Sequence, residues 1–365
     1  MVKKLLITAS TFNSELLTPT EENAERMRDE LKGQGKITVS DPCDGGNGKV
    51  MTPEWLDGAN MVIADLENYT EALLSEVGAG IGGPLELIAR YGIGYDRVDL
   101  EAATEYGVIV ANGPDCNTMS TAERAVGAIY YLTGQFGLQN QRASIGLGKI
   151  GTSNLDISGR TLGVVGLGNI AKRVVELMSG SRSRGMKVIA HDPNHDDVWA
   201  KANGVKYVSE EELYSRAHMI TIHADPQPPK QIVTKDLIDL MQPTAVLVNC
   251  ARGYLVDQKA IHDAVKLGFS SNHSKGAYGY FQDDAWDPVF RDKNGRIYFL
   301  SFDNLNMGAS SHVGSDAPSG IRGMRDKSMI AVYHLVNEIR PAAVVNPDVF
   351  TRHPDLYKHL KVRKS

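Results

Sequence analysis

A glycine-rich segment in the middle of the chain has the spacing that binds dinucleotides. Residues 162–165 are a short apolar run typical of a buried parallel strand, and a helical pattern extends over 169–178. Between them, the G-x-G-x-x-A pattern is formed by Gly166, Gly168 and Ala171. The first glycine permits a sharp turn, the second lets the backbone approach a pyrophosphate, and the alanine lets helix and strand pack closely. The helix begins at Asn169 and Ile170, where free N–H groups favour an anion.

An acidic residue follows the next predicted strand. Residues 186–191 predict that strand, and Asp192 follows it about 20 positions after the glycine turn. A carboxylate there accepts hydrogen bonds from an adenosine ribose and repels a 2′-phosphate, so the cofactor is predicted to be NAD. His191 and His195, with acids beside them, also suggest a metal site. The position of Asp192 favours the ribose contact, and we expect no metal.

Two other segments match the glycine pattern without its context. Residues 78–83 follow a helical pattern at 72–77, and residues 146–151 follow a polar stretch and do not lead into a helix. The pattern alone is weak evidence, because a phosphate site needs a strand before it and a helix after it. We therefore expect only the turn at Gly166 to bind a dinucleotide.

The composition is that of an ordinary globular protein. Hydrophobic residues make up 42% and charged residues 23% of the 365 residues, and the net charge of −5 argues against nucleic-acid binding. Cys43, Cys116 and Cys250 are far apart, so we expect no disulfide framework, no zinc knuckle and a reducing, cytoplasmic setting. No apolar stretch is long enough to span a membrane, and residues 1–10 predict a strand rather than a signal peptide.

Strands and helices alternate along the chain in two blocks. Strands are predicted at 5–8, 61–64, 85–90, 108–111, 162–165, 186–191, 219–223 and 245–249. Helices are predicted at 21–31, 122–132, 235–241, 258–267 and 323–338. We expect a loop or arm at 134–160, irregular structure at 268–311 and a basic surface tail at 339–365. The predicted fold class is α/β, with two Rossmann-like or flavodoxin-like doubly wound parallel-sheet domains and a cleft between them.

Further motifs join the glycine turn in resembling one enzyme family. They are YGIGYDRVD at 91–99, NTMSTAE at 117–123, VNCARGYLVD at 248–257 and a degraded histidine segment, NMGASSHVG, at 306–314. Over residues 85–317 the chain resembles the NAD-dependent D-isomer-specific 2-hydroxyacid dehydrogenases, which include formate, D-lactate, glycerate and phosphoglycerate dehydrogenases. The resemblance implies hydride transfer between NAD and a small 2-keto or 2-hydroxy acid.

The resemblance also implies how the chain is organised. Residues 1–112 with 318–365 would form a discontinuous substrate domain, and residues 113–317 the NAD-binding Rossmann domain. Members of the family are commonly homodimers through an arm after the first domain, and residues 134–160 fit that role by analogy.

Particular residues take the family's catalytic and substrate-binding roles. Arg252 would bind the substrate carboxylate and polarise its carbonyl, because a guanidinium is planar and permanently charged. His312 would be the acid/base, because its ordinary pKa lies near neutrality. The N–H groups of Ile93 and Gly94 would hold the carboxylate. Glu123 would be a buried support.

Other residues would contact the cofactor or the substrate. Asn117 would lie near the substrate, or would only begin a helix. Besides the glycine turn and Asp192, the implied cofactor contacts are Asn169, Ile170, His223, Cys250, Ala251 and Gly314.

One segment departs from the family pattern. The family has G-A-x-D-V-F-E-x-E-P where residues 276–285 are GAYGYFQDDA. The family's aspartate, which contacts the nicotinamide carboxamide, falls on Gly279. The family's glutamate, which pairs with the catalytic histidine, falls on Asp284, where a carboxylate would raise the pKa of His312. Asp283 is a competing candidate, and both aspartates could instead be solvated loop residues.

Two other functions stay open at this point. The glycine at position 279 would also suit an NAD-binding regulatory protein, such as the corepressors that resemble these enzymes. Formate dehydrogenases lack the glutamate as well, but they have a glutamine in its place, and Asp284 is not one.

Overall fold

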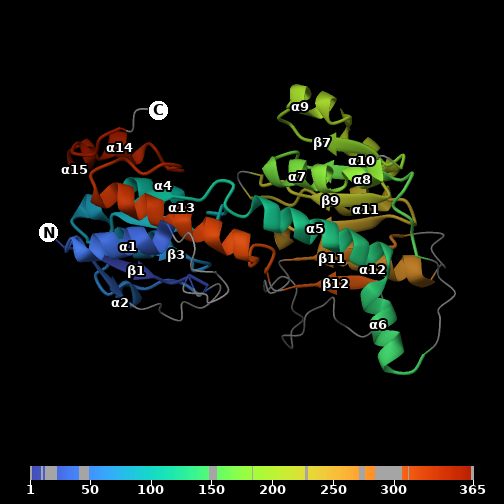
Figure 1. The fold of residues 1–365 in the computed structure, drawn as a ribbon, viewed down its shortest axis with the longest axis horizontal. Coiled ribbons are helices and arrows are strands. Elements are labelled where there is room, and N and C mark those ends of the chain that lie inside the picture. The colour runs from blue at the N-terminus through green and yellow to red at the C-terminus, as the bar shows by residue number, and fades with distance from the viewer. Residues whose placement is uncertain are drawn as a thin grey trace. The chain divides into compact units, whose positions relative to one another are not determined.

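The computed structural model describes residues 2–9, 11–12, 23–40, 49–147, 154–182, 184–226, 229–270, 276–283, 306–310 and 312–362. The chain divides into two compact units, Met1–Asn117 with Asp316–Ser365, and Thr118–Ser315 (Figure 1). The boundaries expected from the sequence, at 112/113 and 317/318, lie a few residues from these changes of unit.

The first unit is built on a parallel sheet of five strands in the order β2-β1-β3-β4-β5. The strands are β1 (Lys3–Ile7), β2 (Ile37–Ser40), β3 (Met61–Ala64), β4 (Leu87–Arg90) and β5 (Ile109–Ala111). The helices of this unit are α1 (Asn23–Gly33), α2 (Pro53–Leu56), α3 (Glu71–Val77), α4 (Leu100–Glu105), α13 (Pro318–Val336), α14 (Val349–Arg352) and α15 (Pro354–Tyr357), with the short 3-10 helix η2 (Ala79–Ile81).

Both faces of this sheet are covered, because successive side chains of a strand point to opposite sides. Leu5, Met61 and Leu87 pack with apolar residues of α1 and α13 on one face. Leu6, Val62 and Ile88 pack with α3 and α4 on the other face. This arrangement explains why β3 and β5 are uninterrupted apolar runs.

The second unit has a parallel sheet of seven strands in the order β12-β11-β10-β9-β6-β7-β8. The strands are β6 (Thr161–Val165), β7 (Lys187–His191), β8 (Val205–Tyr207), β9 (Met219–Ile222), β10 (Val246–Asn249), β11 (Gly279–Gln282) and β12 (Met307–Ala309). The helices are α5 (Thr118–Thr133), α6 (Phe136–Ser144), α7 (Asn169–Leu177), α8 (Ser179–Arg182), α9 (Asp197–Ala202), α10 (Glu210–Arg216), α11 (Lys235–Asp239) and α12 (Gln258–Ser270), with the 3-10 helix η3 (Gly253–Leu255).

Helices also cover both faces of the second sheet. Apolar residues of α5 and α7 pack with Leu162, Val188 and Val248 on one face. Residues of α10, α11 and α12 pack with Val165, Ile220 and Leu247 on the other. The predicted α/β class with two doubly wound parallel sheets is confirmed.

Two segments expected to lack regular structure contain helices or strands. Residues 134–160 include the helix α6, and residues 268–311 include the strands β11 and β12. Both strands are short and are stabilised by pairing with β10 and with each other, which no local pattern reveals. The last long helix, α13, begins at Pro318, five residues before the predicted start, because proline is tolerated in the first turn of a helix.

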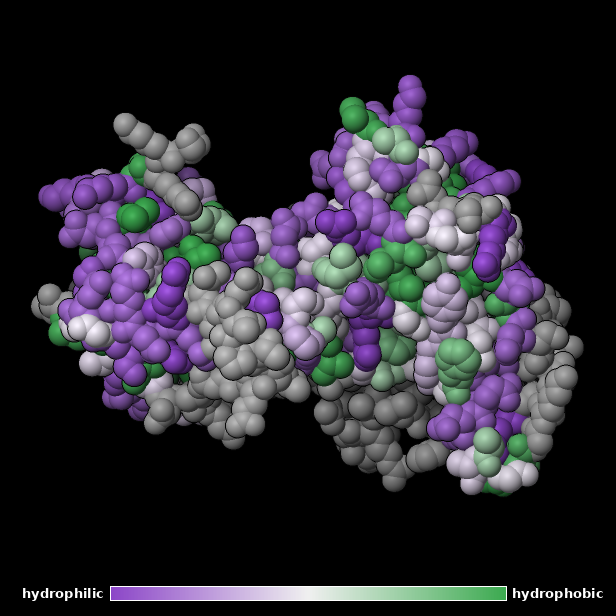
Figure 2. Space-filling view, in the orientation of Figure 1, coloured by the Kyte–Doolittle hydropathy of each residue, from purple (hydrophilic) through white to green (hydrophobic). Residues whose placement is uncertain are grey.

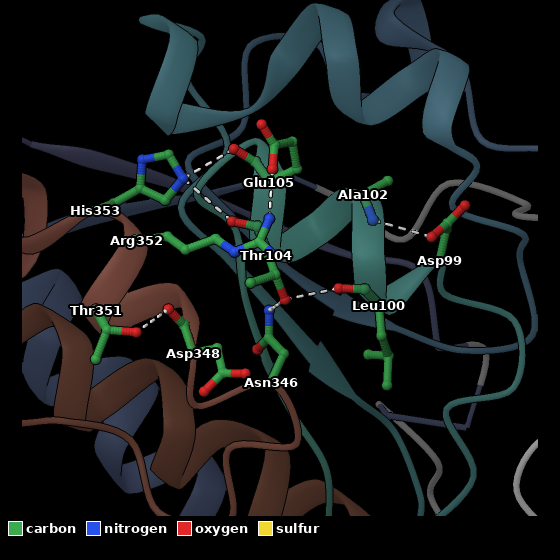
Figure 3. Close-up of polar contacts among 10 residues, drawn as sticks. All are labelled: Asp99, Leu100, Ala102, Thr104, Glu105, Asn346, Asp348, Thr351, Arg352 and His353. Carbon is green, nitrogen blue, oxygen red and sulfur yellow. Dashed lines mark hydrogen bonds and ion pairs between the residues drawn. The ribbon is translucent and has the colours of Figure 1, made fainter.

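The expectation of a surface tail at 339–365 is wrong for its middle part. Phe350 and Tyr357 are buried in the core of the first unit. Asn346, also buried, accepts a hydrogen bond from the N–H of Val110 (2.8 Å) and donates to the Val108 carbonyl (2.9 Å). Figure 3 shows Asn346 and His353 facing the C-terminal end of α4. The tail is therefore an integral part of the first unit.

No helix among the described residues combines the length and the apolar character that crossing a bilayer requires.

Candidate functional site

The predicted site residues of the second unit lie at one edge of its sheet. All seven strands run parallel, so their carboxyl ends meet at the same edge, and β6 lies between β7 and β9 at the point where the strand order reverses. The predicted site residues that directly follow these strand ends, or lie in the loops after them, are Gly166, Asp192, His223, Cys250, Ala251, Arg252, Asp283, His312 and Gly314.

The two glycines of the turn are each explained by a different structural feature. Gly166 has a φ of +82°, and a Cβ on it would lie 2.7 Å from the Ala224 nitrogen. Gly168 precedes α7 as its N-cap, and a Cβ there would meet no protein atom within 4 Å. The fold itself therefore requires Gly166, whereas Gly168 keeps the helix N-terminus accessible to a group such as a phosphate. Ala171 is completely buried, as close packing of helix and strand requires.

Asp192 joins the glycine turn to the end of β7. Its Oδ2 accepts a hydrogen bond from the N–H of Leu167 and its Oδ1 one from the N–H of Asn194, both at 2.7 Å. An ionised carboxylate offers about four acceptor positions, so this half-buried group can still accept hydrogen bonds from ribose hydroxyls. The same side chain thus shapes the turn and remains able to bind a sugar.

Arg252 follows β10 in a turn held by a buried asparagine. Asn249 accepts a hydrogen bond from the N–H of Ala251 (3.0 Å) and donates to the carbonyl of Arg252 (2.8 Å). The guanidinium is half-buried, and its Nη1 donates to the Ala251 carbonyl at 3.2 Å. The backbone from which Arg252 projects is therefore fixed, which suits a side chain that must hold a planar anion.

A chain of neutral polar groups lies behind this turn. Asn249 also donates to Gln282 Oε1 (2.9 Å), and the Tyr280 hydroxyl donates to the same oxygen (2.5 Å). Gln258 donates to the carbonyl of Gly253 at 2.8 Å. Sequence reasoning missed Gln258, Tyr280 and Gln282, and the one available signal was their polarity next to apolar runs.

His312 lies in the loop after β12 in the left-handed backbone region, with a φ of +58°. Its N–H donates to the carbonyl of Asp283 at 2.6 Å. The Asp283 side chain is buried and accepts hydrogen bonds from Arg124, Ser310 and Gly314. Asp284, predicted to pair with His312, lies outside the described residues, so that pairing stays a prediction.

The residue of α5 that reaches this site is not the predicted one. Glu123, expected to be buried, is exposed. Its neighbour Arg124 donates from Nε to Asp283 Oδ1 at 3.0 Å. Neighbouring residues of a helix point about 100° apart, so only the packing of α5 decides which side chain turns inward.

Two titratable groups at this edge are neutral at pH 7. Burial lowers the pKa of His223 to about 4, and its Nε2 lies 2.9 Å from the Thr221 hydroxyl. Burial raises the pKa of the Cys250 thiol well above its usual range, with a further increase from Asp283. Neither side chain therefore brings a charge to the edge, whereas Arg252, Asp192 and the Arg124–Asp283 pair do.

The second unit is similar to a known family of NAD-binding domains. Residues 134–273 match the family model described as D-isomer specific 2-hydroxyacid dehydrogenase, NAD binding domain. This match lies within the second unit. The resemblance stated from the sequence motifs is thereby confirmed.

Two curated relatives illustrate the similarity. A D-3-phosphoglycerate dehydrogenase of Methanocaldococcus jannaschii is 39% identical over 190 residues, which are 50% of this chain and 35% of that protein. Another, from Mycobacterium leprae, is 35% identical over 186 residues, again 50% of this chain and 35% of the relative. The matched region thus spans about a third of the length of these relatives.

Two solved structures illustrate the similarity of fold. D-lactate dehydrogenase from Aquifex aeolicus, complexed with NAD and lactic acid, has a TM-score of 0.71 at 22% identity, covering 92% of this chain and 96% of that chain. The apo-structure of D-lactate dehydrogenase from Escherichia coli has a TM-score of 0.70 at 20% identity, covering 94% and 100%.

Gly279 does not lie where the family pattern placed the nicotinamide contact. It is the first residue of β11, three positions before the strand end, and therefore about 10 Å from the edge that carries Arg252. A Cβ on Gly279 would lie 2.6 Å from the side chain of Asn306. This glycine is explained by packing, and it no longer supports the interpretation of the chain as a regulatory protein that lost a cofactor contact.

The predicted residues of the first unit follow the carboxyl end of β4. The Ile93 carbonyl accepts a hydrogen bond from Asn112 (2.8 Å), and the Gly94 carbonyl accepts one from the buried Arg90 (3.0 Å). Both peptide carbonyls are thus held, and Ile93 itself is 40% exposed. Asn117 is buried directly before α5, which is compatible with either role given to it above.

Proposed function

We propose that this protein is an NAD-dependent dehydrogenase that interconverts a small 2-keto acid and the corresponding D-2-hydroxy acid. The observation that carries the proposal is the common position of Arg252, His312 and the glycine turn at the carboxyl edge of one sheet. A cation for a carboxylate, an imidazole for a proton and a dinucleotide turn are the groups this reaction needs. The match to the family's NAD-binding domain supports the same reaction.

The chemistry assigned to the chain's own residues is binding and proton transfer. When bound, NAD supplies or accepts the hydride. Arg252 binds the substrate carboxylate and draws electron density from the adjacent carbonyl. His312 donates a proton to the carbonyl oxygen during reduction and takes it back during oxidation. The N–H groups of Ile93 and Gly94, and the side chain of Asn117, complete the proposed substrate contacts.

The glycine turn fits NAD in two respects. Gly168 offers a site where no protein atom obstructs a phosphate, and Asp192 keeps acceptor capacity for ribose hydroxyls beside it. A 2′-phosphate would meet the Asp192 carboxylate, so NADH should be preferred to NADPH. The other proposed contacts are Asn169, Ile170, His223, Cys250, Ala251 and Gly314.

The first unit takes the role of substrate domain and the second that of cofactor domain in this proposal. We also propose a homodimer that uses α6. Figure 2 shows hydrophobic side chains at the free end of α6. Ile145 directly follows this end and is 64% exposed, and Phe136, at the other end of the helix next to α5, is 59% exposed. Exposed apolar side chains at both ends of one helix offer contact area to a second copy of the chain. The mass in solution, measured by light scattering for the parent and for Phe136→Ser, tests this part.

The reaction itself is tested with purified protein, NADH and NADPH in parallel, and glyoxylate, hydroxypyruvate, pyruvate and bulkier 2-keto acids as substrates. We expect oxidation of NADH with at least one of them. In Arg252→Lys and His312→Gln, kcat/KM should fall by about 100-fold or more, because each loses a group used in the transition state.

The matched controls are Arg216→Lys and His359→Gln, which change exposed residues. Arg216 ends α10, before β9 begins, and His359 follows α15 in the first unit. They should leave the rates unchanged. A protein that binds NADH but oxidises it with none of these acids would refute the proposed activity. A preference for NADPH would refute the role given to Asp192.

A further inference from the structure

His312 is held in an unusual backbone conformation. Its φ of +58° lies in the left-handed region, which costs a residue with a side chain about 1 kcal/mol or more. Such a conformation persists only where the surroundings hold it. The contacts of residues 310 and 312–314 therefore show what holds the backbone from which the imidazole projects.

One aspartate makes three of the contacts seen among the described residues of this loop. The carbonyl of Asp283 accepts the N–H of His312 at 2.6 Å. Its carboxylate accepts the Ser310 hydroxyl at 2.5 Å before the histidine, and the N–H of Gly314 at 3.0 Å after it. Asp283 thus binds the loop on both sides of His312 and at His312 itself.

The aspartate is itself fixed in the core. Its N–H donates to the carbonyl of Asn249 at 2.9 Å, which continues the pairing of β10 with β11. Only 3% of Asp283 is exposed, and a buried carboxylate needs a partner. Arg124 of α5 is this partner, with its Nε 3.0 Å from Asp283 Oδ1. Its guanidinium lies 5.4 Å from the centre of the Phe281 ring.

Gly314 gives an independent indication that the loop is shaped around this carboxylate. A Cβ at that position would lie 2.7 Å from Asp283 Oδ2. The φ of Gly314 is not positive, so its backbone conformation does not require glycine. Glycine is required at this position because the Asp283 carboxylate occupies the space of a Cβ.

We propose that Asp283, neutralised by Arg124, is a positioning residue that holds His312 in its left-handed conformation and so directs the imidazole. The inference deepens the proposed function, in which His312 moves the proton. It differs from a pairing of His312 with Asp284, because Asp283 acts through the backbone and the loop rather than through the ring.

The test uses the full chain with histidines labelled at Cε1, and the His312 resonance is assigned with His312→Gln. In Asp283→Asn the His312 signal should shift and broaden, because the loop is no longer held. Gly314→Ala should cause a smaller change by displacing the carboxylate, and Ser310→Ala the smallest. The controls are Asp263→Asn, in an exposed pair with Lys259, and Gly127→Ala, where a Cβ meets nothing within 4 Å.

The same variants are compared in turnover. A misplacement on the order of 1 Å costs up to about 100-fold, so kcat should fall about 10- to 100-fold in Asp283→Asn, with KM changed far less. The losses of Arg124→Ala and Asp283→Asn should not add in the double variant, since both break one pair.

The resonance separates this inference from the proposed function. A His312 signal that is unchanged in both Asp283→Asn and Ser310→Ala would overturn the positioning role, whatever the activity. A signal that changes as expected in a protein without turnover would support the positioning role and refute the dehydrogenase reaction instead. Equal losses of kcat in the controls would also overturn the inference.

Discussion

Two segments of this chain have the same glycine pattern and use it for different purposes. Residues 166–171 follow the carboxyl end of β6, whereas residues 78–83 connect α3 to β4 and so lie before a strand. In the second case a Cβ on Gly78 would overlap the carbonyl oxygen of Tyr106. On Gly80 a Cβ would lie 2.5 Å from the ring of His353. These glycines are required by packing, because a side chain there would overlap other residues of the protein.

The turn at 166–171 differs at its second glycine. Gly166 is required by its φ of +82° and by Ala224, but a Cβ on Gly168 would meet no protein atom within 4 Å. A glycine that the fold does not need is informative about a ligand, whereas one that the fold needs is informative about packing. Substitutions in the two segments should therefore affect different quantities, stability in one and cofactor binding in the other.

The largest effect is expected at Gly78. In Gly78→Ala the new methyl group would overlap the carbonyl oxygens of Tyr106 and Leu74. The free energy of unfolding should fall by about 3 kcal/mol, while the folded protein keeps its affinity for NADH. Urea denaturation and NADH titration measure the two quantities. A loss of NADH affinity without a loss of stability would contradict the assignment of this segment to packing.

The next effect concerns His223, whose carbonyl carbon lies beside Gly166. Its pKa of about 4 in the folded protein is below the ordinary 6.5, so the unfolded chain binds more protons between these values. The stabilisation is complete above pH 6.5 and is lost as the pH falls through 4, by about 3 kcal/mol in total. Denaturation without NADH across this range should show a shallower slope for His223→Asn than for the control His359→Gln.

A smaller effect, on cofactor binding rather than on stability, is expected at Gly168. Gly168→Ala should weaken NADH binding about tenfold, because a methyl group occupies the space proposed for the phosphate. The free energy of unfolding should change by less than about 1 kcal/mol, the usual cost of alanine at an N-cap. Gly127→Ala serves as the control for both quantities. If the affinity for NADH is unchanged, the space beside Gly168 is not the binding site of the phosphate.

The smallest effect is expected at Asp192. In Asp192→Asn one oxygen can still accept the N–H of Leu167, so the turn should stay folded. NADH affinity should fall about threefold to tenfold and discrimination against NADPH should weaken, because the repulsive charge is removed. Parallel titrations with both cofactors measure this. If Asp192→Asn prefers NADH to NADPH as strongly as the parent does, other residues determine this preference.

Sequence alone was sufficient where local patterns carry the information. The apolar runs of β6 and β7, the glycine turn between β6 and α7, and the acid after β7 were all predicted within a residue or two. Each depends on residues close together in the chain, where turn geometry and strand burial leave few alternatives. The family's NAD-binding domain was predicted on the same basis.

Tertiary structure decided the parts that depend on partners distant in sequence. Whether Glu123 or Arg124 turns inward depends on how α5 packs, and the contact of Asp283 with the loop around His312 depends on the register of β11. A shift of one residue moves every side chain of a strand to the other face, so no spacing rule could assign these roles. Gly279 shows the same limit, since only the pairing of β11 with β10 revealed that it lies at the far end of the strand.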